Sequence, residues 1–196
     1  MKIRVPLIYA SFLVELKNFC TFEDTTIEER EIVSSIFLNK GGNHLIRGWI
    51  AFLAFWGAPI EQPNHAELAV RCALNISKKL DELRERWKEE GKPAIDCGMG
   101  LNTGEVLVGN IGVEGKKMDY TVIGDSVNLA ARVEKLTRQY GTRMLLTEYK
   151  YTLEHIKECL DSNRLGHIKL TDLDEVKVKG KEKGVRVYKL EFIEKT

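Results

Sequence analysis

One stretch of the chain decides how the rest is interpreted: Met118-Asp-Tyr-Thr-Val-Ile-Gly-Asp-Ser-Val-Asn-Leu-Ala-Ala-Arg132. Its pattern predicts a strand, a tight turn at Gly124-Asp125 and the start of a helix. Asn128 and Arg132 are four positions apart on that helix, so they lie on one face. An amide can orient a hydroxyl or ether oxygen, and a guanidinium can hold a phosphate through two parallel hydrogen bonds. The pair therefore suits a nucleotide, because phosphoryl chemistry depends mainly on positioning and charge stabilisation.

Four other segments extend this pattern along the chain: Ala54-Phe-Trp-Gly-Ala-Pro59, Asn64-His-Ala-Glu-Leu-Ala-Val-Arg71, Gly100-Leu-Asn-Thr-Gly-Glu-Val-Leu-Val-Gly-Asn-Ile-Gly112 and Val178-Lys-Gly-Lys181. In their order and spacing, these segments and the first stretch resemble the class III nucleotide cyclases, the adenylate and guanylate cyclases. The resemblance extends from about Gly41 to Leu190, and residues 1–40 resemble the family only weakly.

The resemblance implies an α/β (α+β) fold with a ferredoxin-like βαββαβ core and additional strands and helices. It also implies a reaction that joins the ribose 3′-oxygen of a nucleoside triphosphate to its α-phosphorus and releases pyrophosphate. ATP is favoured over GTP as the substrate. Two divalent ions, Mg²⁺ or Mn²⁺, assist this reaction in the family. The family's site lies between two cyclase domains, so the resemblance implies a homodimer or a heterodimer with another cyclase domain.

Bulk properties agree with one globular domain over residues 1–196, with a divergent and shortened region at 1–40. The 30 basic and 29 acidic residues nearly cancel, so no nucleic-acid partner is expected. Cys20, Cys72, Cys97 and Cys159 are widely spaced, which indicates core residues in a reducing, cytoplasmic compartment. The apolar stretch from Trp49 to Pro59 is too short to span a bilayer, so no membrane segment is expected in this chain.

Hydrophobic periodicity and turn residues predict the elements between the motifs. The expected strands lie at Val5–Leu16, within His44–Phe55 (one or two), at Ile95–Leu101 and Val106–Val108 joined by a hairpin at Asn102–Glu105, and at Tyr120–Ile123, Met144–Leu146, Leu173–Val178 and Val185–Phe192. The expected helices lie at about Thr25–Leu38, from Asn64 to Trp87, from the Gly124-Asp125 turn to Arg138, and at Glu148–Leu160. Asn64 and Glu67 have the spacing of a capping box at the start of the second helix.

By resemblance, Asn128 would orient the ribose and Arg132 would stabilise charge that develops on the α-phosphate. Lys179 would hold the terminal phosphates, and Thr121 would help to read the purine. Each residue also has a simpler interpretation as a helix-surface, strand or turn residue.

The metal-binding half of the family's site is the departure. The second metal aspartate of the family falls on Ile50, the glycine before it falls on Trp49, and the purine-selecting residue falls on Ile46. No aspartate lies between Asp24 and Asp81. Isoleucine offers no oxygen to a hard cation.

The first metal aspartate has its best match in Leu13-Val-Glu-Leu-Lys-Asn-Phe-Cys20, which puts Glu15 in its place. Glu15 could ligate a metal through its longer side chain, or it could simply end a strand in solvent. The shortened helix that follows Glu15 leaves the register of residues 1–40 open.

Three hypotheses follow for the function. In the first, the chain is the metal-deficient half of a heterodimeric cyclase. In the second, it is a non-catalytic pseudo-cyclase used for nucleotide binding, dimerisation or regulation. In the third, it is a weak homodimeric adenylate cyclase that depends on Glu15. Whether the chain is an enzyme by itself stays open at this point.

Overall fold

The computed structural model describes residues 2–14, 44–47, 51–92, 95–113, 117–177 and 184–193. Several predictions fall outside these ranges: Glu15, Trp49, Ile50, Lys179 and the helix expected at about Thr25–Leu38. They stay predictions.

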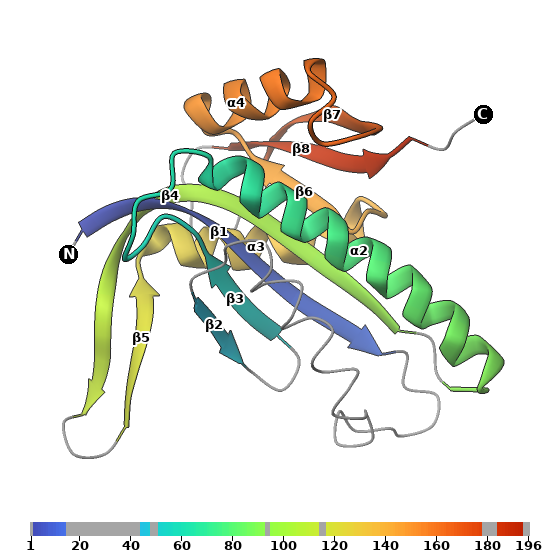
Figure 1. Ribbon diagram of the computed structural model, residues 1–196, viewed down its shortest axis with the longest axis horizontal. Helices are drawn as coiled ribbons and strands as arrows, with labels where there is room; N and C mark the ends of the chain where they lie inside the picture. The colour runs from blue at the N-terminus through green and yellow to red at the C-terminus, as the bar shows by residue number, and fades with distance from the viewer. Residues whose placement is uncertain are drawn as a thin grey trace.

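The described elements are strands of very different lengths and three helices, of which α2 is the longest (Figure 1). The strands are β1 (Lys2–Val14), β2 (His44–Arg47), β3 (Ala51–Phe55), β4 (Ile95–Val113), β5 (Lys117–Ile123), β6 (Met144–Thr147), β7 (Ile168–Val176) and β8 (Val185–Phe192). The helices are α2 (His65–Glu89), α3 (Asp125–Gln139) and α4 (Lys150–Asp161).

The strands form one sheet in the order β2-β3-β1-β4-β6-β8-β7, and β5 pairs with β4 beyond that path. β4 and β6 pair in parallel. Parallel strands need a crossover connection, and α3 provides the helix of the segment that joins them. The other described pairs are antiparallel. The mixed α/β architecture predicted from the sequence is therefore confirmed.

Helices cover both faces of the sheet (Figure 1). α2 and α4 pack on the face that carries Cys97, Met99 and Leu101 of β4, in the largest core cluster. α3 packs on the other face, where its Val133 meets Leu145 of β6. Alternate residues of a strand point to opposite faces, so β4 serves both layers.

The hairpin predicted at Asn102–Glu105 is wrong. β4 is continuous from Ile95 to Val113, and the four residues pair with β1 through partners that include Leu7↔Asn102 and Val5↔Gly104. The Asn-Thr-Gly run has the composition of a turn. Residues 4–7 of β1 lie opposite it within a longer antiparallel ladder, and this pairing holds the run extended.

The capping box predicted for α2 is also wrong. Asn64 occupies the N-cap position but its side chain makes no capping hydrogen bond. Glu67 instead bonds Arg71 and residues of α4 and the loop that follows it. A smaller difference concerns a strand limit: β7 begins at Ile168 rather than at Leu173. The region His44–Phe55 forms two strands, within the expected one or two.

Glycines in β4 determine how closely α3 approaches the sheet. A Cβ atom at Gly100 would lie 2.3 Å from the Ala130 carbonyl oxygen and 2.4 Å from the Glu134 nitrogen, both in the backbone of α3. A Cβ at Gly98 would lie 2.4 Å from Thr137 Oγ1. Backbone atoms cannot move aside as the end of a flexible side chain can, so only glycine permits this packing at residue 100.

We expect Gly100→Ala to lower the free energy of unfolding by about 3 kcal/mol, the upper range for overpacking a close contact. Gly109→Ala on the same strand is the matched control, because a Cβ there meets no atom within 4 Å. That variant should be unchanged or more stable by up to about 1 kcal/mol. Urea denaturation of both variants tests the expectation, and equal stability would contradict the close packing of α3.

Candidate functional site

The helix α3 carries the two residues singled out from the sequence. β5 leads through Gly124 into α3, and Asn128 and Arg132 lie one turn apart near its start. Asn128 is exposed and Arg132 is half-buried. The structure therefore puts both side chains on one face of a helix that is anchored to β4.

Arg132 has an unsatisfied donor. Its Nη1 atom is buried and has no hydrogen-bond partner in the described part of the chain. A buried donor without an acceptor costs about 1–3 kcal/mol, more when it carries charge. An oxyanion that reached this nitrogen would remove that cost. The guanidinium is thus held in a position suited to an anionic ligand.

Asn102 fixes the beginning of α3. Its side chain is buried, and its Nδ2 donates to the Ser126 carbonyl oxygen at 2.8 Å. Its Oδ1 accepts from the Thr147 hydroxyl of β6 at 2.6 Å. One amide therefore ties the first turn of α3 to two strands, two residues before Asn128.

Sequence reasoning missed this positioning role because it put Asn102 in a turn. A signal was present in the spacing. Gly98, Gly100, Asn102 and Gly104 alternate along β4, and a Cβ at Gly104 would lie 2.1 Å from Ser126 Oγ. Once β4 is known to be continuous, the same alternation puts Asn102 on the face that α3 covers.

Thr121 lies on β5 opposite Gly109 of β4 and is half-buried. It precedes the Gly124 turn, so it is on the strand that leads into α3. The structure thus groups Thr121, Asn128 and Arg132 on consecutive elements. Lys179 lies outside the described residues.

The described parts of β1, β2 and β3 carry no carboxylate at all. At the end of the β1–β3 ladder, Ser11 pairs with Ala51, the residue that follows Ile50 in the sequence. Mg²⁺ and Mn²⁺ take oxygen ligands, above all carboxylates. These described strands therefore do not fit the pair of metal ions that the family resemblance implies.

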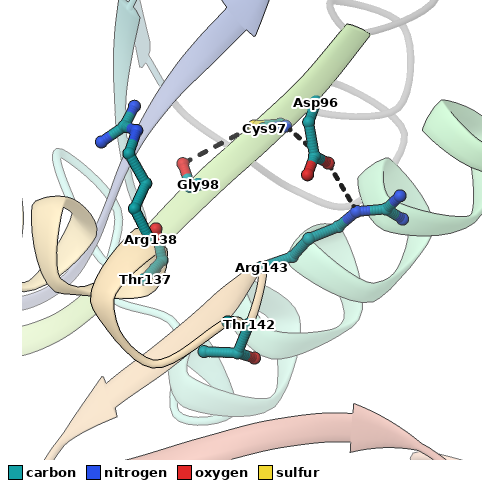
Figure 2. A pocket seen from close by; sticks show the side chains of 8 residues that line it. Asp96, Cys97, Gly98, Thr137, Arg138, Thr142 and Arg143 are labelled. Carbon is teal, nitrogen blue, oxygen red and sulfur yellow. Dashed lines mark hydrogen bonds and ion pairs between the residues drawn. The ribbon is translucent and has the colours of Figure 1, made fainter. Parts of the chain in front are cut away.

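A separate hollow of about 330 Å³ lies at the far end of α3 (Figure 2). It is lined by Asp96, Cys97, Gly98, Thr137, Arg138, Gly141, Thr142 and Arg143. Figure 2 shows the Arg143 guanidinium reaching Asp96, with Nε at 2.7 Å from Oδ1. Arg143 also bonds Asp81 of α2 at 2.7 Å, and these carboxylates raise its pKa. The positive charge of Arg143 is therefore neutralised within the chain by Asp81 and Asp96.

The described cysteines behave as predicted for core residues. Cys72, Cys97 and Cys159 are buried. Burial, with the negative charge of Asp96, raises the pKa of the Cys97 thiol, so this residue in the hollow is not an activated nucleophile.

Comparison with known proteins identifies the family of this fold. The family model described as the adenylate and guanylate cyclase catalytic domain matches residues 50–191. Adenylate cyclase 1 of Rhizobium meliloti is 31% identical over 137 residues, which are 70% of this chain and 19% of that protein.

Two solved structures are similar to equal degrees. The adenylyl cyclase CyaB from P. aeruginosa has a TM-score of 0.73 at 25% identity, with coverage of 99% of this chain and 97% of that one. The guanylyl cyclase Cya2 also has a TM-score of 0.73 at 25% identity, with coverage of 99% and 94%. The likeness does not favour one nucleotide over the other.

The chain belongs to the adenylate and guanylate cyclase catalytic domain family, and it is a class III cyclase domain. It spans about a fifth of the length of the Rhizobium meliloti relative. In the part of the chain that the structure describes, none of the helices has the length and apolarity needed to cross a membrane.

We expect Asn102→Ala to lower the free energy of unfolding by about 1–3 kcal/mol, because it leaves the Ser126 carbonyl and the Thr147 hydroxyl without a partner. Asn110→Ala, at an exposed site on the same strand, should change stability by no more than about 0.5 kcal/mol. Chemical denaturation measures both. If the two variants were equally stable, Asn102 would not anchor α3.

Proposed function

We propose that this domain supplies the Asn128 and Arg132 half of a nucleotide cyclase site, and that a different cyclase domain supplies the metal-binding half. The active species is then a heterodimer that converts a nucleoside triphosphate, with ATP favoured, into the cyclic monophosphate and pyrophosphate. One observation carries the proposal: α3 presents a buried cationic donor without a partner, while β1, β2 and β3 as described present no carboxylate.

The chain's own residues have defined tasks in this reaction. The Asn128 amide, exposed on α3, orients the ribose so that its 3′-oxygen faces the α-phosphorus. The Arg132 guanidinium donates to the α-phosphate oxygens, where negative charge grows as the new bond forms and the bond to pyrophosphate breaks. Donors that are already in place cost no reorganisation at that moment. Thr121 contacts the purine, and Lys179 binds the terminal phosphates.

Divalent ions would supply charge neutralisation at the attacking and leaving oxygens. The strands that hold them in the family do not fit that task here, because their described residues are apolar, basic, aromatic or hydroxylic. Glu15 remains a candidate ligand by resemblance, and Ile50 is not one. A partner with carboxylates on the corresponding strands would complete the site.

Association with another domain is supported by an exposed apolar pair. Leu107 of β4 and Ile123 of β5 face each other in the ladder and are 54% and 51% exposed. Leu107 also pairs with Lys2, the first residue of β1, so this pair lies where the β4–β5 ladder extends beyond β1. An interface that covered them would be stabilised by about 25 cal/mol for each Å² of apolar surface removed from water.

The proposal predicts that the purified chain makes no cyclic nucleotide from ATP or GTP with Mg²⁺ or Mn²⁺. Activity should appear when it is mixed with a metal-competent cyclase domain whose own counterparts of Asn128 and Arg132 have been replaced by alanine. That partner is silent as a homodimer, so any product must come from a site shared with this chain. Quantifying cyclic AMP and cyclic GMP by chromatography gives the result.

In this mixture Arg132→Ala should lower turnover by about 100-fold or more, as removal of one such donor does. Lys135→Ala, at an exposed site on the same helix, is the matched control and should leave turnover unchanged. Activity of the chain alone that disappears in Glu15→Ala would favour a homodimeric cyclase. Nucleotide binding by calorimetry without turnover in any pairing would favour a non-catalytic pseudo-cyclase. Either result contradicts the proposal.

A further inference from the structure

A cluster of three metal-ligating side chains lies between α2 and α4, on the face of the sheet opposite α3. Glu67 comes from the first turn of α2, and His155 and Cys159 are one turn apart on α4. Glu67 and Cys159 are buried, and the His155 side chain is 30% exposed. We call these three residues the α2–α4 cluster.

The three donor atoms already converge. Cys159 Sγ lies 3.4 Å from Glu67 Oε2, and His155 Nε2 lies 3.8 Å from the same oxygen. One ligand atom from each residue lies within 4.8 Å of the other two. Around a tetrahedral zinc ion, with bonds of about 2.0–2.3 Å, neighbouring donors are roughly 3.3–3.8 Å apart. Small side-chain rotations therefore bring the cluster to metal-binding geometry.

An unsatisfied nitrogen points to a missing ligand. His155 Nε2 is buried and has no hydrogen-bond partner in the described part of the chain. His65 Nδ1 is also buried without a hydrogen-bond partner in the described part of the chain. Burial lowers the pKa of His65, and so, to a smaller extent, does the nearby His155 imidazole. A purely structural ion-pair cluster gives no reason for a buried imidazole nitrogen to remain unpaired beside a thiol and a carboxylate.

We propose that the α2–α4 cluster binds a zinc-class divalent transition metal through Cys159 Sγ, His155 Nε2 and Glu67 Oε2, with water in the fourth position. Mixed sulfur, imidazole and carboxylate donors select zinc and its neighbours and do not suit Mg²⁺. This site is separate from the ion pair that assists cyclases, and it does not depend on the proposed function.

Two arginines share the charge of Glu67, and their arrangement allows a metal to enter. Arg71 holds the other carboxylate oxygen, with Nη2 at 2.7 Å from Oε1, and would keep the carboxylate oriented. Arg164 Nη1 lies 3.0 Å from Oε2, and its side chain is 44% exposed, so it can turn into solvent. Metal binding then exchanges one partner of Oε2 for another.

The exchange at sulfur is balanced by one proton. Burial raises the pKa of the Cys159 thiol to about 11, so the metal-free residue is a thiol that donates to Glu67. When the metal–sulfur bond forms, the S–H bond breaks and the proton goes to solvent. The bound metal links α2 to α4, whose other contacts are largely apolar.

Cobalt(II) is a spectroscopic probe for this site. Titration of the full chain should give a thiolate-to-cobalt charge-transfer band in the near ultraviolet and tetrahedral bands in the visible, and Zn²⁺ should displace both. Cys159→Ser should lose the charge-transfer band. His155→Ala should weaken cobalt binding by at least about tenfold, within the range expected for a disrupted metal site. The exposed His167→Ala is the matched control and should bind like the native chain.

His155→Ala also separates a metal ligand from a structural residue. Its Nε2 makes no hydrogen bond, so the melting temperature of the metal-free variant should stay close to that of the native chain. Zn²⁺ should raise the melting temperature of the native chain and of His167→Ala but not that of His155→Ala. The proposal is overturned if the native chain shows no thiolate band, if Cys159→Ser retains it, or if His155→Ala binds cobalt with native affinity.

Discussion

The approach of the α3 backbone to β4 is the contact on which the arrangement of the site depends. At Gly100 no side chain separates the strand from the helix, because a Cβ atom there would meet the helix backbone at 2.3 Å. The helix therefore lies at one depth and in one rotation relative to the sheet. Asn102 then fixes its first turn through the Ser126 carbonyl. These two contacts determine the positions of Asn128 and Arg132 on the helix relative to the sheet.

Arg132 lies on this closely packed helix and has a buried donor. The neighbouring described residues provide no acceptor for its Nη1 atom. The strands β1 and β3 differ from α3 in the residues they carry. β3 buries Leu53, Ala54 and Phe55, and the described residues of β1 and β3 include no carboxylate. Burying a charge in the absence of a counter-ion would be costly. A division of labour between two domains is consistent with this asymmetry.

The two faces of the sheet carry different chemistry. α3 offers hydrogen-bond donors on one face. On the other, α2 and α4 enclose soft and borderline metal ligands around Glu67. Glu67 is in a sequence position that suits a helix cap, but it has stronger partners: Arg71 on its own helix, the Cys159 thiol of α4 and Arg164 in the loop after α4. Charge-assisted bonds of this kind outweigh a single capping bond.

From the sequence alone, the mixed α/β fold, the family, the position of α3 and the pairing of Asn128 with Arg132 on one face could be predicted. Local patterns determine these features, because helical spacing and strand alternation act over a few residues. The continuity of β4, the role of Asn102 and the cluster of Glu67, His155 and Cys159 were decided only by the tertiary structure. Each depends on partners far away in sequence. β1 holds the Asn-Thr-Gly run extended, and the Cys159 thiol of α4 bonds the Glu67 carboxylate, which makes no capping bond. Local propensity could not reveal them, because the conformational preferences of single residues are weak and long-range pairing overrides them.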